Sequence, residues 1–370
     1  MKRFLFVVPP LTGHINPTAA VGAELMKRGH DVAWVGHPGT LEPLLPHGAT
    51  IFPALDDDLE KEIQEARQRW LDLRGIAVLK FLWEEFLIPL AHAMIPGVTD
   101  AVRIHRPDVL IADQQALAGP VVAREAGVPW VTSASTSAEL VNPLRFMPKV
   151  DDWVRAQLHD LAGADVRFSD RLVVAFTTPE LVGTRDFPDH YVFTGPAIER
   201  QESGDFPWDR LEDKPRILVS LGTLNVGPRF LTEVAEATYG YQVIMVAPPT
   251  VEVPEHVLRM DRVPQLALMN HVNTVITHGG HNTVCEALAH GLPLVVAPIR
   301  DDQPIVAQQV VEANAGVRLK YARVRAPGIR AALDEVLHNP DYAAGARRVQ
   351  LSFEAAGGAV AAAEHLEAVV

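Results

Sequence analysis

The amino-acid sequence predicts an α/β protein with two doubly wound parallel sheets. Two series of short apolar strands alternate with helical segments, which is typical of βαβ units. A polar stretch at residues 199–214 separates the two series, and the length of 370 residues suits two domains. We therefore expect an N-terminal domain at 1–198, a linker at 199–214, a second domain at 215–346, and a C-terminal helix at 347–370 that can pack back on the first domain.

The first half opens on a strand at 4–9 and continues to another at 31–36. Between them, Asn16 before Pro17 has the character of a helix N-cap followed by proline at the first helical position, which predicts a helix at 17–28. The same patterns predict mostly helical structure at 59–105 and further strands at 108–112, 129–133, 171–176 and 191–194.

The second half repeats this alternation. The pattern predicts strands at 216–220, 242–246, 274–277 and 293–297, with helices starting at 228, ending at 290, and covering 304–314. Ligands of such folds bind at the carboxyl ends of the strands, so two halves facing each other predict a cleft. A dehydrogenase is excluded, because the loop after the first strand lacks Gly-x-Gly-x-x-Gly.

Composition narrows the class of protein further. The net charge of −13 and the absence of any Lys/Arg block argue against nucleic-acid binding. The lone Cys285 excludes an internal disulfide and a cysteine zinc cluster, and favours a reducing, cytoplasmic location. We expect neither a signal peptide nor a transmembrane segment, since the apolar runs are too short.

The segment 277–303 gathers polar residues at the ends of two predicted strands. His278 ends a strand, and two glycines lead into a helix near Asn282, a geometry that binds anions. Glu286 lies one turn further and can accept hydrogen bonds from ribose hydroxyls. Taken one at a time, these features are more often an ordinary turn or helix cap. Together they predict a nucleotide-sugar site.

These residues resemble the donor-binding signature of the GT-B glycosyltransferases of the UDP-glycosyltransferase superfamily. Residues 262–265 fit its opening, 278–283 fit its core in the form common among bacterial members, and Glu286 and 302–303 follow at matching spacing. The match is closest to the bacterial natural-product and macrolide type. It implies two Rossmann-like domains facing across a cleft, with the acceptor in the first and a UDP- or dTDP-sugar in the second.

The resemblance also implies roles for single residues. The core would hold the diphosphate, Glu286 the ribose, and residues 302–303 the sugar hydroxyls, while Arg262 replaces the base-stacking tryptophan of plant members and leaves UDP or dTDP open. The donor-binding set is Gly222, Thr223, Arg262, Val263, Gln265, His278, Gly280, Asn282, Thr283, Glu286, Asp302 and Gln303.

A histidine and a carboxylate are predicted at one edge of the first sheet. His14 follows the first strand and Asp113 ends a later one. A histidine oriented by a carboxylate suits general-base catalysis, although a surface histidine and a helix-capping aspartate are the simpler interpretation. Residues 10–17 and 107–130 resemble the family segments that carry the catalytic histidine and its partner. The resemblance implies an inverting transfer of a hexose or deoxyhexose, with neither metal nor cofactor.

The acceptor is predicted only by class. The helical insert and the loop at 133–147 would bind a hydrophobic polyketide, macrolide or phenol, or else a carotenoid or lipid. Their large apolar residues can equally be ordinary core: Trp70, Phe81, Trp83, Phe86, Phe146 and Met147. Two rival functions stay open, a GT-B nucleotide-sugar epimerase and a non-catalytic homologue that activates a partner transferase.

Overall fold

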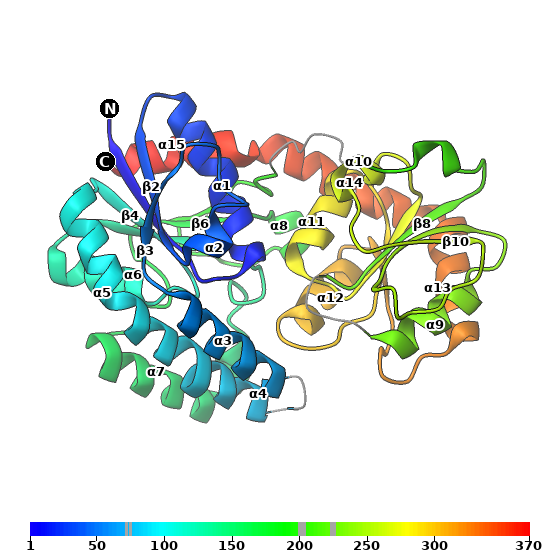
Figure 1. Ribbon diagram of the computed structural model, residues 1–370, viewed down its shortest axis with the longest axis horizontal. Coiled ribbons are helices and arrows are strands. Elements are labelled where there is room, and N and C mark those ends of the chain that lie inside the picture. Colours follow the sequence, from blue (N-terminus) through cyan, green and yellow to red (C-terminus); the bar gives the residue numbers. More distant parts are fainter. Residues whose placement is uncertain (71–72, 74–75, 199–204, 223–226) are drawn as a thin grey trace. The chain divides into compact units, whose positions relative to one another are not determined.

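The computed structural model describes residues 1–70, 73, 76–198, 205–222 and 227–370 (Figure 1). Thr223 of the predicted donor set and the first part of the predicted linker lie outside the described residues. The chain forms two compact units. Unit 1 contains Met1–Phe176, Asp186–Glu199 and Gly357–Val370, and unit 2 contains Thr177–Arg185 and Arg200–Ala356.

Within the described part of unit 1, seven parallel strands form one sheet. Their order across the sheet is β3 (Thr50–Pro53), β2 (Asp31–Gly36), β1 (Arg3–Val7), β4 (Val109–Asp113), β5 (Trp130–Ala134), β6 (Val173–Ala175) and β7 (Tyr191–Phe193). The strand order reverses between β1 and β4, which are hydrogen-bonded neighbours. The carboxyl ends beside such a reversal are where open α/β sheets bind ligands.

Helices cover both faces of this sheet. Along β1, Leu5 and Val7 pack into one core while Phe4 and Phe6 pack into the other, as the alternation of strand side chains requires. The helical and turn elements are α1 (Thr12–Lys27), α2 (Pro38–Leu41), α3 (Asp57–Trp70), α4 (Ile76–Phe81), the π-helical η1 (Leu82–Leu87), α5 (Ile88–His105), α6 (Ala118–Ala126), η2 (Pro143–Phe146), α7 (Pro148–Ala162) and α15 (Gly358–Val369).

The predicted start of the first helix is wrong. Helix α1 begins at Thr12, so Asn16 is not an N-cap, Pro17 lies inside the helix, and His14 sits in the first turn instead of a loop. The fully buried Ile15 packs into the core and anchors this turn against the sheet. That burial outweighs the single backbone hydrogen bond that Pro17 cannot donate.

The C-terminal segment is two helices instead of one. Helix α14 (Pro340–Ala356) belongs to unit 2, and Gly357 interrupts the helix with a φ of 87°. Helix α15 packs against α1 in unit 1. There the Arg28 guanidinium donates to the Glu367 carboxylate over 2.7 Å.

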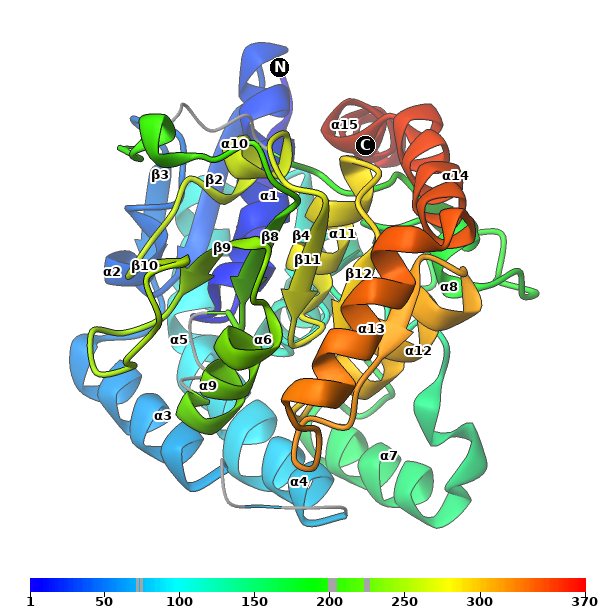
Figure 2. The same ribbon diagram turned by 90° about the vertical axis from the view of Figure 1, so that its right-hand side faces the viewer.

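Unit 2 has a smaller sheet of the same kind (Figure 2). In its described residues, six parallel strands lie in the order β10 (Val257–Met260), β9 (Gln242–Val246), β8 (Arg216–Ser220), β11 (Thr274–Thr277), β12 (Leu294–Val296) and β13 (Gly316–Arg318). The remaining elements are α8 (Pro179–Val182), η3 (Trp208–Arg210), α9 (Pro228–Ala237), α10 (Gln265–Met269), α11 (His281–Ala289), α12 (Gln303–Glu312), α13 (Ala326–His338) and α14. The predicted fold class is thereby confirmed.

The sequence pattern did not predict three short edge strands: β3, β10 and β13. Phe206 and Trp208, from the described end of the predicted linker, pack into the core of unit 2. In the described part of the chain, no helix is both long and apolar enough to cross a membrane.

Candidate catalytic and donor-binding sites

The predicted histidine and aspartate meet at the carboxyl edge of unit 1. His14, on α1, places Nδ1 2.8 Å from Oδ1 of Asp113, the last residue of β4. The Asp113 side chain is completely buried, whereas 15% of the His14 side chain is exposed. The backbone N–H of Gln115 also donates to Asp113 Oδ1 over 2.9 Å. The carboxylate is thus fixed by the loop that follows its own strand, and it orients the imidazole.

Ser135 is a third member that sequence reasoning missed. It directly follows β5, and its hydroxyl donates to Asp113 Oδ2 over 2.6 Å while lying 2.7 Å from His14 Nδ1. The side chain is buried, with 3% of the residue exposed. Its position in the chain is the signal that could have found it. Strand β5 pairs with β4, so the residue after β5 lies close to Asp113 at the end of β4.

We expect Ser135→Ala to lower kcat roughly 3- to 10-fold without changing the affinity for the donor, because one hydrogen bond to Asp113 is lost. Steady-state kinetics measures both quantities. Ser133→Ala is the matched control, since the buried Ser133 hydroxyl has no hydrogen-bond partner among the described residues. An unchanged kcat in Ser135→Ala would show that the hydroxyl does not help to orient the pair.

The predicted anion site lies at the carboxyl edge of unit 2. Strand β11 ends at Thr277, His278 and Gly279 follow, and Gly280 caps helix α11. Gly279 has a φ of 90°, and a side chain there would collide with Val296, so only glycine suits this turn. The backbone N–H groups of a first helical turn and the helix dipole favour an anion.

The His278 ring lies between two glycines. A Cβ atom would come within 2.8 Å of the ring at Gly222 and within 2.6 Å at Gly280. Burial lowers the pKa of His278 to about 4, although Asp302 and the Ser220 backbone act in the opposite direction. His278 is therefore a neutral hydrogen-bonding group near pH 7.

This pKa predicts a pH dependence of stability. The unfolded chain takes up a proton at His278 near pH 6.5, its ordinary value, while the folded chain does so only near pH 4. Stability is therefore lost as the pH falls between those values. Relative to His278→Gln, we expect the wild type to lose about 2 kcal/mol between pH 7 and pH 5.

Chemical denaturation at the two pH values measures this difference. The pKa values of Glu286 and Glu139 are raised, so these two groups add stability as the pH falls. Their contribution is the same in the wild type and in His278→Gln, and it cancels in the difference between the two proteins. His338→Gln controls for removal of an exposed histidine. Parallel pH curves for wild type and His278→Gln would contradict the depressed pKa.

Glu286 and Gln265, two members of the predicted donor-binding set, contact each other. The Gln265 amide donates to Glu286 Oε2 over 2.6 Å, joining α10 to α11. Burial raises the pKa of Glu286 to about 7, and the bond from Gln265 opposes this shift. Asn282 and Thr283 are half-buried in the first turn of α11, Val263 packs against the unit 2 core, and Arg262 is exposed.

The loop between β12 and α12 is held by hydrogen bonds to the side chain of Gln303. The Gln303 side-chain oxygen accepts the backbone N–H groups of Ile299 and Arg300 over 2.9 and 3.0 Å. Asp301 has a φ of 56°, which is unusual for a residue other than glycine. Asp302 precedes α12 and is close enough to raise the pKa of His278. The side-chain oxygen of Gln303, which was predicted to contact the sugar, therefore binds the backbone of its own loop.

The six predicted acceptor residues do not form one group. Phe81, Trp83 and Phe86 are buried in a core of unit 1, and Trp70 packs against it. The other two lie on the surface, where Phe146 is 77% exposed and Met147 is 36% exposed. The simpler interpretation, ordinary core, therefore describes the three buried residues.

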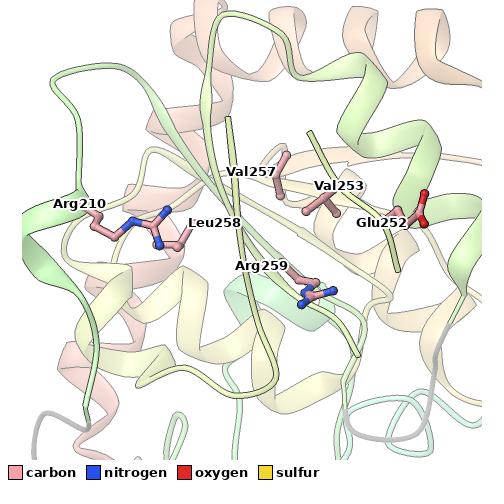
Figure 3. A pocket seen from close by; sticks show the side chains of 6 residues that line it. All are labelled: Arg210, Glu252, Val253, Val257, Leu258 and Arg259. Carbon is pink, nitrogen blue, oxygen red and sulfur yellow. The ribbon is translucent and has the colours of Figure 1, made fainter. Parts of the chain in front are cut away.

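A depression of about 550 Å³ lies beside the edge strand β10 of unit 2 (Figure 3). Its lining residues do not include any predicted site residue: Arg210, Glu252, Val253, Val257, Leu258 and Arg259. In the part of the chain that the structure describes, no group of three or more His, Cys, Asp or Glu side chains could hold a metal ion.

Known proteins share this organisation over the whole chain. Residues 243–368 match the family model described as Erythromycin biosynthesis protein CIII-like, C-terminal domain. The NDP-glycosyltransferase YjiC of Bacillus subtilis (strain 168) is 28% identical, covering 97% of this chain and 95% of that protein. The 4'-demethylrebeccamycin synthase of Lentzea aerocolonigenes is 27% identical, covering 100% and 99%.

A solved glycosyltransferase structure is similar to this chain in three dimensions as well. The crystal structure of the glycotransferase of kitacinnamycin superposes with a TM-score of 0.76 at 25% identity, covering 100% of this chain and 99% of that one. The chain has the GT-B fold, and over its whole length it is similar to glycosyltransferases. The histidine–aspartate pair lies in unit 1, and the residues of the predicted donor signature lie in unit 2.

Proposed function

We propose that this protein is a glycosyltransferase that moves a hexose or deoxyhexose from a UDP- or dTDP-sugar to a hydroxyl of a hydrophobic small molecule, with inversion at the anomeric carbon. The single observation that carries the proposal is the His14–Asp113 contact of 2.8 Å at the carboxyl edge of the unit 1 sheet. Because Nδ1 faces Asp113, Nε2 is the nitrogen that would take the acceptor proton.

The proposed reaction is one displacement. The acceptor oxygen loses its proton to His14 Nε2 and attacks the anomeric carbon, while the bond to the diphosphate breaks on the opposite face. Asp113 stabilises the resulting imidazolium. Only one displacement occurs, so the configuration inverts.

The leaving diphosphate would be stabilised by unit 2. The N-terminus of α11 offers backbone N–H groups and a positive dipole end, and the neutral His278 adds a hydrogen bond. These groups supply positive potential where charge develops, so we propose that transfer needs neither a metal ion nor a further cofactor.

The acceptor class is proposed from relatives and from composition. One relative is named for synthesis of 4'-demethylrebeccamycin and the solved structure for kitacinnamycin, which supports a natural-product acceptor. The exposed Phe146 and Met147 on the loop after β5 are the predicted residues that such a molecule can reach.

A panel of phenolic, polyketide and macrolide acceptors, incubated with UDP-glucose or dTDP-glucose in EDTA, tests the proposal by mass spectrometry. A hexose adduct formed in EDTA establishes transfer and its independence of metal, and the anomeric coupling constant of the product reports inversion. Product that appears only after Mg²⁺ is added would overturn the metal-independent mechanism. Failure to bind either nucleotide-sugar would overturn the function itself.

A further inference from the structure

Thr277 carries a buried hydroxyl next to His278 that has no part in the proposed mechanism. It is the last residue of β11, and it pairs with Ser220 of β8 on one side and with Val296 of β12 on the other. The residue is completely buried. A hydroxyl group at such a place has lost its contact with water, so its hydrogen bonds have to be made inside the protein.

The Thr277 hydroxyl contacts two groups of the turn that follows β11. Its oxygen accepts the backbone N–H of Gly279 over 3.4 Å, and it lies 3.3 Å from Nδ1 of His278. These are the hydrogen-bond partners that the hydroxyl has among the described residues. A hydroxyl group has one proton to donate. Since the Gly279 N–H is itself a donor, Nδ1 of His278 is the acceptor that remains for this proton.

The position of the proton on the His278 ring follows from this contact. A neutral imidazole has one N–H group, and its other ring nitrogen is an acceptor. If the Thr277 hydroxyl donates to Nδ1, the ring proton is on Nε2. If the ring proton were on Nδ1, the Thr277 oxygen would face two donors, and its own proton would lack an acceptor in the part of the chain that the structure describes. The first arrangement satisfies all three groups.

The other ring nitrogen, Nε2, lies at the start of helix α11. A Cβ atom on Gly280, the N-cap of this helix, would come within 2.6 Å of Nε2, and a Cβ atom on Gly222 within 3.1 Å. Nε2 therefore lies against the backbone at the helix N-terminus that is proposed to stabilise the leaving diphosphate. With a proton, Nε2 can donate to a phosphate oxygen, whereas an unprotonated Nε2 presents a lone pair that repels it.

We propose that Thr277 is a positioning residue that holds His278 in the form with the proton on Nε2, so that the imidazole donates a hydrogen bond to the leaving diphosphate. The proposal rests on the proposed role of His278. The backbone of Ser220 also acts on the ring and favours its protonated form. Without the Thr277 hydroxyl, Nδ1 loses its donor, and a proton on Nδ1 is no longer disfavoured.

A purely structural role for Thr277 predicts something different. If the hydroxyl only held the backbone of Gly279, its removal would lower stability without moving the proton of His278. Thr277→Val has nearly the same shape and lacks the hydroxyl, while Thr277→Ser keeps it. Thr274→Val is the matched control, because Thr274 is equally buried on the same strand and its hydroxyl donates to the Pro293 carbonyl over 2.8 Å.

The test is an NMR spectrum of the full-length protein with isotope-labelled histidine at neutral pH, in which His278→Ala identifies the His278 signals. The nitrogen that carries the proton and the nitrogen that does not differ in chemical shift. We expect the proton on Nε2 in the wild type, in Thr277→Ser and in Thr274→Val. In Thr277→Val, we expect a substantial share of it on Nδ1.

Nucleotide binding gives a second measurement of the same contact. Thr277→Val should weaken the binding of UDP or dTDP roughly 3- to 10-fold, which corresponds to the loss of about one hydrogen bond. Thr274→Val should bind the nucleotide like the wild type. When His278→Ala is already present, the further change Thr277→Val should leave the affinity unchanged, because both residues act through one contact.

A wild-type protein with the His278 proton on Nδ1 would overturn the proposal, and so would a folded Thr277→Val protein whose proton stays on Nε2. The spectrum is recorded without donor or acceptor, so these outcomes are distinct from a failure of the proposed function, which would appear as a lack of transfer by the wild type. Equal losses of nucleotide affinity in Thr277→Val and Thr274→Val would also contradict the proposal.

Discussion

His14→Ala is expected to lower kcat/KM for sugar transfer by about 10²- to 10⁴-fold, the usual contribution of a positioned general base. Without the imidazole, the acceptor hydroxyl must lose its proton to water while it attacks. The buried Asp113 carboxylate also loses the group that faces it at 2.8 Å. The effect should fall on kcat, because proton transfer belongs to the chemical step.

Nucleotide binding provides the control for this variant. His14 is in unit 1 and the donor signature is in unit 2, so isothermal titration calorimetry should give His14→Ala the wild-type affinity for UDP or dTDP. Asp113→Asn should also lose activity while it keeps the shape of the side chain. Transfer by His14→Ala within a few-fold of the wild-type rate would remove the histidine as an essential base.

Glu286→Ala is expected to weaken binding of the nucleotide-sugar by roughly 10- to 100-fold, since hydrogen bonds to a charged group contribute about 1.5 to 3 kcal/mol. The proposed contact is with the ribose hydroxyls. Burial raises the pKa of Glu286 to about 7, so a carboxylate that accepts these bonds exists mainly above that pH. Wild-type affinity should therefore fall as the pH drops below 7.

The pH series gives the sharpest outcome for Glu286. In Glu286→Gln, the affinity should be low and should lose this pH dependence, because the amide does not titrate. UDP should lose more affinity than dTDP, whose sugar lacks one hydroxyl. Glu312→Ala, at an exposed carboxylate on α12, is the matched control. Equal affinity of wild type and Glu286→Ala for both nucleotides would place the ribose elsewhere.

The central strands were predictable because both faces of each sheet are covered. Buried on both sides, β1, β4 and β8 read as uninterrupted apolar runs. The edge strands were missed for the opposite reason. Of β3, no residue is fully buried, and β13 is only three residues long, so neither has a pattern that distinguishes it from a loop.

The site residues that belong to a short, continuous sequence motif were predictable. The core of the donor signature, residues 278–283, runs without a break from the end of β11 into α11, and Gly279 and Gly280 indicate the turn between them. The start of α1 was missed because Asn16-Pro17 is a strong local signal. Only burial of Ile15 in the tertiary structure, which the local signal does not contain, overrides it.

By itself, the sequence determined the two-sheet α/β architecture, the histidine and aspartate of unit 1, and the donor signature of unit 2. These follow from strand periodicity and from motifs whose members are close along the chain. Only the tertiary structure decided that Ser135 completes the contacts of His14 and Asp113. Such partners come from different strands, and pairing of β4 with β5, not sequence spacing, brings them together.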